Sequence, residues 1–224
     1  CNGHMGQVIT QLVEKDPEIE IVAGIDLNDC RDNGYPVFTA NCRGEKYMVR
    51  LSIMGRHNVL NAMVALAVAD LSGVPLSGAV KCLAAFTGFQ NRQQVMQKHG
   101  ITAIDDTYNA SPVSMKAGLE VLEATAKGRR IAVLADMKEL GPDSPKFHYE
   151  VGSWMKSHPV DILFTYGELA EQIARGAKRA GMKAEYIHFE ENRRDALAEA
   201  IRAKLPAKII CSKCSSQTIT LNSS

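Results

Sequence analysis

The chain has 224 residues, of which 46% are hydrophobic and 23% are charged, as is typical of a globular protein with one large or two small domains. Its 26 basic and 25 acidic residues give a formal net charge of +1, which offers no electrostatic attraction for nucleic acid or an anionic membrane. No apolar run reaches the roughly 20 residues of a membrane span, and no signal peptide is visible, so we expect a cytoplasmic protein.

The first part of the chain is irregular, with short elements separated by loops. Residues 6–14 predict a short helix, and residues 20–25 and 47–53 alternate in polarity and predict strands. The segment 26–36 is rich in Asp, Asn, Gly and Pro and predicts a loop.

Two helices are expected next, at residues 57–71 and 76–85, because apolar residues recur there at helical spacing. Gly73 and Pro75 end the first of them.

From residue 101 onward, strand-like and helical segments alternate regularly. The predicted strands span residues 101–104, 131–135, 162–166, 184–189 and 208–211. The predicted helices span residues 114–126, 147–157, 169–180 and 193–205. Such alternation favours an α/β fold of the Rossmann-like kind, a parallel sheet with flanking crossover helices.

One group of polar residues begins the helix at residue 57, within the segment Gly55–Ala62. His57, Asn58 and Asn61 share one helical face, since they are three and four residues apart. Their amide and imidazole groups can hydrogen-bond an adenine edge. The alternative is helix capping and surface polarity.

A second group follows the strand that begins at Ile101, where Asp105 and Asp106 precede Thr107, Tyr108 and Asn109. Ligands bind at the carboxyl ends of strands in open α/β sheets, so this turn is a candidate binding site. The alternative is a capped turn in which the Asp and Asn side chains serve only the backbone.

A third group follows the strand at residues 131–135. Asp136 would face the same edge of the sheet as Asp106, and Glu139 and His148 are a candidate acid–imidazole pair. The alternative is a loop carboxylate and a histidine at a helix start. We expect Asp106 and Asp136 to leave neighbouring parallel strands at one edge of the sheet, beside Arg92. The guanidinium of Arg92 is suited to binding phosphate. The alternative is a solvated surface arginine.

These segments resemble, in order and approximate spacing, motifs of the Mur ligase family, and the resemblance covers about residues 43–211. It is closest to the members that add D-alanyl-D-alanine to UDP-N-acetylmuramoyl-tripeptide, which implies these small-molecule substrates and, in the intact enzyme, ATP and Mg²⁺. By resemblance, ATP is bound by His57, Asn58, Asn61, Arg92 and Asp106. By resemblance, the substrate cleft is formed by Tyr108, Asn109, Asp136, Glu139 and His148.

The chain departs from the family pattern at a few positions. Asn91 stands where the family usually has Gly before the arginine, Thr107 replaces Ser, Ser111 replaces a second Asn, and Ala135 replaces Gly. The family's Val-Lys-Gly-Ser-Arg ending is also altered, since Cys214 stands at the glycine position.

The resemblance also implies a domain organisation. Residues 41–90 would be the end of the central ATPase domain, residues 91–212 the C-terminal domain, and residues 213–224 a disordered tail. The sequence has no Gly-Lys pair and therefore no G-x-x-x-x-G-K-[ST] phosphate loop. We therefore expect no ligase activity from this chain alone.

Residues 1–39 resemble instead the start of the dihydrodipicolinate reductases, and we treat residues 1–40 as a truncated dinucleotide-binding-like fragment. Gly3 and Gly6 would form a vestigial dinucleotide turn, and Asp26 the acid that reads the ribose. Because the first strand and first glycine are absent, a loop without a ligand is favoured and NAD(P)H binding is not expected. A reductase-like fragment, a gene-fusion remnant and a non-catalytic nucleotide-binding module remain alternatives.

Overall fold

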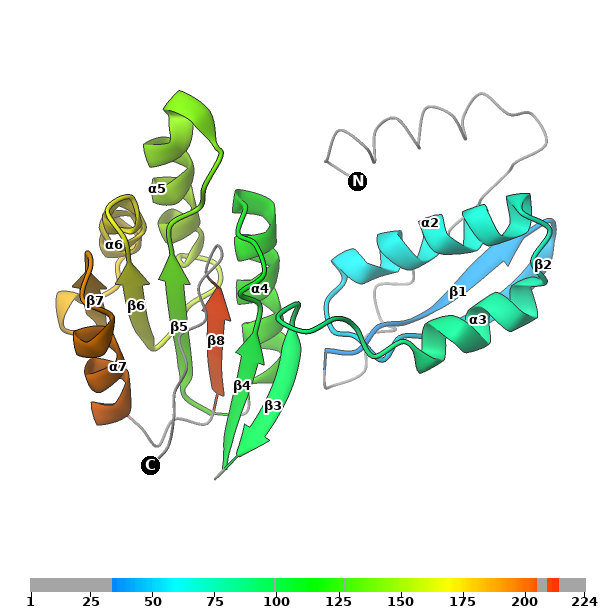
Figure 1. Cartoon of the computed structure of the whole chain (residues 1–224), viewed down its shortest axis with the longest axis horizontal. Helices are drawn as coiled ribbons and strands as arrows, with labels where there is room; N and C mark the ends of the chain where they lie inside the picture. The colour runs from blue at the N-terminus through cyan, green and yellow to red at the C-terminus, as the bar shows by residue number, and fades with distance from the viewer. Residues whose placement is uncertain (1–33, 99, 127, 205–208, 214–224) are drawn as a thin grey trace. The chain divides into compact units, whose positions relative to one another are not determined.

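The computed structural model describes residues 34–98, 100–126, 128–204 and 209–213. The chain divides into two compact units, Cys1–Thr87 and Gly88–Ser224 (Figure 1). The expected helix at residues 6–14, the expected strand at residues 20–25 and the glycine turn lie outside the described residues, as do residues 214–224 of the expected tail.

The first unit contains a β-hairpin. β1 (Val37–Cys42) pairs antiparallel with β2 (Glu45–Arg50) through a two-residue turn. Arg43 and Gly44 in this turn both have positive φ, 50° and 81°, as a turn that matches the twist of its strands requires. The sequence predicted a strand near β2 but not β1, and the hairpin crosses the boundary expected between residues 40 and 41.

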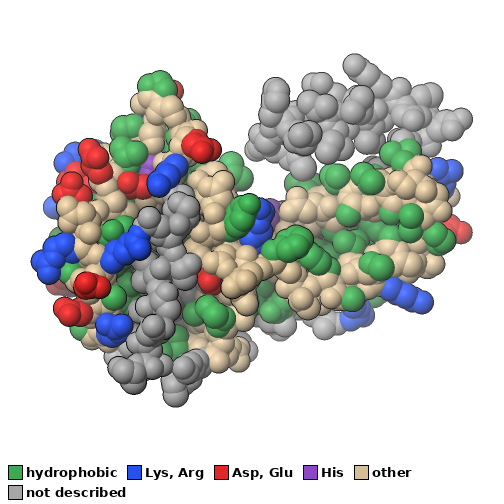
Figure 2. Space-filling view, viewed as in Figure 1, with side chains coloured by type: hydrophobic (Ala, Val, Ile, Leu, Met, Phe, Trp, Pro, Cys, Tyr) green, Lys and Arg blue, Asp and Glu red, His purple; other side chains and the backbone are tan. Residues whose placement is uncertain are grey.

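Two helices cover one face of the hairpin, α2 (His57–Leu71) and α3 (Leu76–Ala85), with the bounds that the sequence predicted. The buried core between them consists of Phe38, Ala40, Val49, Leu51, Val59, Ala62, Met63 and Leu66. A second apolar stripe on α2, formed by Leu60, Val68 and Leu71, is exposed in the described part of the chain. Figure 2 shows hydrophobic side chains at the surface over α2 and α3. Residues 34–87 of this unit therefore bury only one of the two apolar faces of α2.

The second unit is built on a six-stranded sheet of order β3-β4-β8-β5-β6-β7 (Figure 1). Its strands are β3 (Gln94–Lys98), β4 (Ile101–Asp105), β5 (Arg130–Ala135), β6 (Ile162–Tyr166), β7 (Ile187–Glu190) and β8 (Ile209–Lys213). All pairings are parallel except that of β3 with β4. The expected Rossmann-like α/β fold is confirmed.

Helices cover both faces of this sheet. They are α4 (Pro112–Thr125), α5 (Ser144–Trp154), α6 (Ala170–Arg179) and α7 (Arg194–Ala203). The chain steps in one direction from β4 to β7, so right-handed crossovers place α4, α5 and α6 on one face. The return from β7 to β8 reverses direction, which places α7 on the other face. There Leu197 and Ile201 pack on Ile131, Val133, Ile162 and Phe164.

The structure differs from the sequence-based expectation in three details. The antiparallel edge strand β3 was not expected, and residues 184–186 form a 3-10 turn before β7 rather than the start of a strand. The expectation that the strands before Asp106 and Asp136 are neighbours was wrong, because β8 lies between β4 and β5. The chain order of strands does not reveal such an insertion.

Helices α5 and α6 cross unusually closely through two glycines. A Cβ atom added at Gly152 would lie 2.0 Å from the carbonyl oxygen of Ile173, and one added at Gly176 would lie 2.2 Å from that of Tyr149. Because both obstacles are backbone atoms, no side-chain rotation could relieve the contact. The close packing of these helices therefore depends on the absence of side chains at both positions.

Candidate functional site

The residues that follow β4 and β5 lie at the carboxyl edge of the sheet. Both strands run parallel to β8, which lies between them, so Asp106 and Asp136 emerge at the same edge, as the sequence predicted. In open α/β sheets this edge binds ligands, especially where the strand order reverses direction.

The turn after β4 separates the roles of its two aspartates. Asp105 Oδ1 accepts hydrogen bonds from the backbone N–H of Thr107 (3.1 Å) and from its hydroxyl (2.7 Å), so Asp105 holds the turn. Asp106 is 7% exposed and Tyr108 is 59% exposed. The alternative of a self-capped turn thus describes Asp105, whereas Tyr108 is exposed and Asp106 is buried beside it.

Arg92 lies against this turn. Its Cζ atom is 3.9 Å from the centre of the Tyr108 ring, so the guanidinium stacks on the aromatic face. The backbone N–H of Tyr108 also donates to the carbonyl of Asn91, at 3.0 Å. Stacking occupies the face of the guanidinium, whereas its N–H groups lie in its plane and point outward. The stacked Arg92 can therefore bind an anion through the N–H groups at the edge of its guanidinium.

The end of the same turn leads into α4. Asn109 is exposed, and its Oδ1 accepts from the backbone N–H of Ala110 at 2.8 Å. Ser111 is the N-cap of α4 and forms a reciprocal capping box with Ser114. The replacement of Asn by Ser at position 111 is therefore compatible with helix initiation.

Asp136 lies against the start of α6. Its Oδ1 accepts from the backbone N–H of Ala170, the first residue of α6, at 2.7 Å. Gly167, at φ 112°, approaches so closely that an added Cβ would lie 2.4 Å from the Asp136 carboxylate. This carboxylate therefore serves the helix start, a contact that the sequence did not indicate.

We expect Asp136→Ala to lower the free energy of unfolding by about 1–2 kcal/mol, because a helix start loses its side-chain acceptor. Asp136→Asn keeps an acceptor oxygen and should lose less. Glu139→Ala, in the same loop, is the matched control and should change stability by less than about 0.5 kcal/mol. Urea denaturation measures all three, and equal stability of Asp136→Ala and wild type would contradict the capping role.

His148 is fully buried, with both ring nitrogens bonded to backbone. Nε2 accepts from the N–H of Met137 (2.8 Å), and Nδ1 donates to the carbonyl of Ser144 (2.7 Å). These partners assign the proton to Nδ1. Glu139 is exposed and lies at φ 62°. The suggested acid–imidazole pair with Glu139 was wrong, because both nitrogens instead fasten the loop after β5 to α5.

In the first unit, His57, Asn58 and Asn61 lie in the first turns of α2. Asn58 Nδ2 donates to the carbonyl of Met54 (2.6 Å), and Asn61 Nδ2 donates to Asn58 Oδ1 (3.0 Å). The contact between Asn58 and Asn61 agrees with the shared helical face inferred from their spacing. The bond to Met54 gives Asn58 a structural role at the helix start, as the alternative interpretation held.

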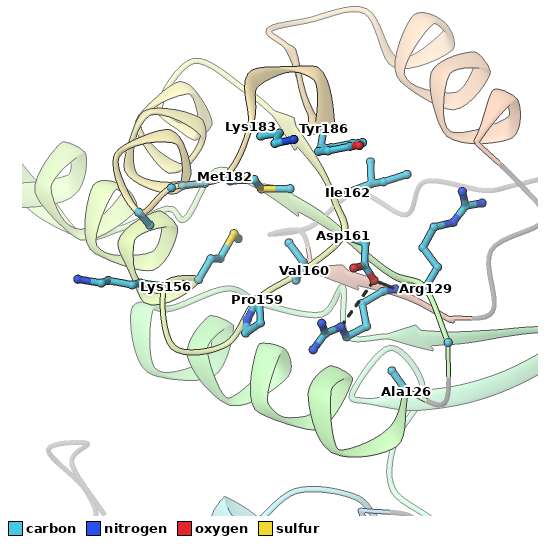
Figure 3. Close-up of a pocket in the computed structure, with 16 residues that line it drawn as sticks. Ala126, Arg129, Lys156, Pro159, Val160, Asp161, Ile162, Met182, Lys183 and Tyr186 are labelled. Atoms are coloured by element: carbon cyan, nitrogen blue, oxygen red, sulfur yellow. Dashed lines mark hydrogen bonds and ion pairs between the residues drawn. The ribbon is translucent and has the colours of Figure 1, made fainter.

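A pocket in the second unit lies elsewhere. It has a volume of about 1090 Å³ and is lined by Arg130 and Ile162, which begin β5 and β6, and by the ends of α4, α5 and α6 (Figure 3). Asp161 accepts the backbone N–H of Arg130 there, at 2.6 Å. This is the amino edge of the sheet, opposite Asp106 and Asp136, so we do not assign the candidate site to it.

Sequence reasoning missed several residues that shape the candidate site. Asn91 contacts Tyr108 and Gly167 contacts Asp136, whereas Thr107 bonds to Asn91 and Asp105. The signal for Asn91 was its replacement of a glycine, since Asn is the non-glycine residue that best tolerates positive φ. No local sequence pattern indicated Gly167. It follows β6 and Asp136 follows β5, so their contact depends on the pairing of two strands that are distant in sequence.

The described residues show neither a metal-binding cluster nor a membrane-spanning helix. They contain no group of three or more His, Cys, Asp or Glu side chains that could hold a metal ion. No helix within these residues is both long and apolar enough to cross a membrane.

A family model, described as Mur ligase, glutamate ligase domain, matches residues 91–215, which is more than half of the chain. The chain belongs to the Mur ligase family. UDP-N-acetylmuramoyl-tripeptide–D-alanyl-D-alanine ligase of Bacillus subtilis is 37% identical over 145 residues, covering 64% of this chain and 32% of that protein. The corresponding ligase of Escherichia coli is 34% identical over 127 residues, covering 56% and 28%.

Solved structures of Mur ligases are also similar. MurF from Acinetobacter baumannii matches with a TM-score of 0.70 at 29% identity, over 89% of this chain and 41% of that one. MurF from Thermotoga maritima, in complex with ADP, matches with a TM-score of 0.68 at 22% identity, over 93% and 45%, and shows the shared fold. The chain thus spans about a third of the length of the curated relatives and less than half of these structures.

Proposed function

We propose that this Mur ligase chain is part of the ATP-dependent enzyme that joins D-alanyl-D-alanine to UDP-N-acetylmuramoyl-tripeptide. The observation that carries the proposal is the grouping of Arg92, Asp106 and Tyr108 at the carboxyl edge of the sheet. The names of its relatives support the choice of substrates.

The proposed roles follow from side-chain chemistry. Arg92 contacts an ATP phosphate, because a guanidinium binds phosphate through two parallel N–H groups. Asp106 accepts a hydrogen bond from a ribose hydroxyl. Separately, the polar face of His57, Asn58 and Asn61 in the first unit is proposed to bind an adenine edge through its amide and imidazole groups.

The substrate cleft is proposed on the same sheet edge. Tyr108 and Asn109 are exposed after β4, and Glu139 is exposed after β5, so these three can contact a bound dipeptide. Asp136 and His148, assigned to this cleft by resemblance, act instead by holding the loops around it, given their backbone contacts.

The chain supplies only part of the proposed enzyme. The family reaction activates a carboxylate with ATP, and phosphoryl transfer depends on a phosphate cradle and a metal ion. The sequence has no G-x-x-x-x-G-K-[ST] phosphate loop. The exposed stripe of Leu60, Val68 and Leu71 fits a unit that packs against further protein. We therefore propose that this chain does not ligate by itself.

Calorimetric titration of the chain with Mg-ATP tests the nucleotide site. We expect measurable binding by wild type and roughly ten-fold or greater weakening in Arg92→Ala and Asp106→Asn, since each removes a charge or a charge-assisted hydrogen bond. Arg179→Ala, at the end of α6, is the control and should bind like wild type.

Three results would contradict the proposal. The first is tighter binding of NADPH than of ATP, which would favour the reductase-like alternative. The second is wild-type affinity in both site variants. The third is release of phosphate on adding ATP, Mg²⁺, UDP-N-acetylmuramoyl-tripeptide and D-alanyl-D-alanine to the chain alone, which would overturn the inference that it is incomplete.

A further inference from the structure

Asn91 adopts a backbone conformation that most residues avoid. Its φ is 61°, in the left-handed region where glycine is favoured and where Asn is the best tolerated of the other residues. Glycine at this position would satisfy the backbone equally well. The retained side chain of Asn91 is therefore free to perform a second task.

That side chain is hydrogen-bonded to the turn after β4. Asn91 Nδ2 donates to the hydroxyl of Thr107 at 3.0 Å, and the same hydroxyl donates to Asp105 Oδ1 at 2.7 Å. The carboxylate can only accept, so the Thr107 proton points to Asp105 and its lone pairs face Asn91. The three side chains form a directed network, and Thr107 within it is 4% exposed.

The network joins the segments that carry the stacked pair. Arg92 follows Asn91, and Tyr108 follows Thr107, and the Tyr108 backbone N–H donates to the Asn91 carbonyl at 3.0 Å. Asn91 therefore bonds to both Thr107 and Tyr108, and the side chains of Arg92 and Tyr108 stack at 3.9 Å beside these bonds. Arg92 itself is exposed, and without such support its long side chain would sample many rotamers.

We propose that Asn91 is a positioning residue, which holds the Arg92 guanidinium on the Tyr108 ring by donating its side-chain amide to Thr107. Pre-organising the guanidinium lowers the entropy lost when it binds an anion. This role rests on the proposed function, because the anion is taken to be an ATP phosphate. This role adds Asn91 and the hydroxyl of Thr107 to the groups that determine nucleotide affinity.

Four variants, two at each position, test the proposal in the whole chain, with Thr107→Ser as the control. Asn91→Gly keeps the positive φ but removes the amide, whereas Asn91→Asp keeps a similar shape and replaces the donor by an acceptor. Thr107→Val removes the hydroxyl at nearly constant volume, whereas Thr107→Ser keeps it. We expect Mg-ATP to bind roughly three- to ten-fold more weakly to Asn91→Gly, Asn91→Asp and Thr107→Val, the range for one lost hydrogen bond, and normally to Thr107→Ser.

A second readout reports the stacking without nucleotide. Protons of an arginine side chain above an aromatic ring resonate upfield in an NMR spectrum, so the Arg92 signals should move downfield in the three weakened variants and stay in Thr107→Ser. A merely structural role would lower the unfolding temperature but leave the Arg92 signals and ATP affinity of the folded protein unchanged.

The outcomes separate the two proposals. Failure of wild type to bind ATP overturns the proposed function and this role in it. Normal ATP binding by wild type, with unchanged affinity and unchanged Arg92 signals in Asn91→Gly and Thr107→Val, overturns the positioning role alone.

Discussion

Replacing His148 by alanine is expected to lower the free energy of unfolding by about 4 kcal/mol. The substitution leaves the buried N–H of Met137 without its acceptor and removes the bond from Nδ1 to the Ser144 carbonyl, and a buried donor left unpaired costs about 1–3 kcal/mol. The volume vacated by the imidazole adds a cavity. The loop after β5 should open as a result, which faster hydrogen exchange at the Met137 amide would reveal.

His158→Ala provides the comparison for this experiment. His158 Nδ1 lies 2.7 Å from Glu123 Oε2 at a partly exposed position, where such pairs contribute about 1 kcal/mol or less. Urea denaturation of both variants should therefore show a loss several times larger for His148→Ala. Equal losses in the free energy of unfolding, or unchanged hydrogen exchange at the Met137 amide, would mean that His148 does not hold the loop. His148 would then again be a candidate ligand-binding residue.

Replacing Gly152 by alanine is expected to destabilise the second unit by about 3 kcal/mol or more. The added methyl group would meet the backbone of α6 at 2.0 Å from the Ile173 carbonyl oxygen, so α5 and α6 must move apart. Overpacking of this kind typically costs about 1–3 kcal/mol, and contact with backbone rather than a flexible side chain favours the upper end. Because His148 lies one turn before Gly152 on α5, the shift should also disturb the Met137 contact.

Gly78→Ala is the matched helical control. Gly78 lies within α3, and an added Cβ there would meet nothing within 4 Å. Alanine should stabilise that helix by about 0.5–1 kcal/mol, since glycine is the poorer helix former. Thermal unfolding of the two variants should move in opposite directions. A neutral Gly152→Ala variant would show that the two helices are not held at the close distance seen here.

Local sequence patterns were sufficient to predict the helices and strands that depend mainly on neighbouring residues. The bounds of α2 and α3 follow from apolar spacing and from Gly73 and Pro75, and the repeating strand–helix pattern after residue 101 indicated a parallel sheet. The strand β1 and the edge strand β3 were missed, because each lies beside loop-forming residues and depends on its antiparallel partner. The motif residues Asp106 and Asp136 were correctly expected at one sheet edge, since parallel strands end at the same side.

The sequence by itself determined the Mur ligase motifs, the α/β fold class and the edge at which the candidate site lies. Only the tertiary structure decided that β8 separates β4 from β5, and that Asp136 and His148 bond to backbone at α6, at α5 and in the loop after β5. Only it showed that Asn91 reaches Thr107, sixteen residues away. The physical reason is that these contacts join segments distant in the chain, whereas helix periodicity, turn chemistry and strand alternation report only on neighbours along it.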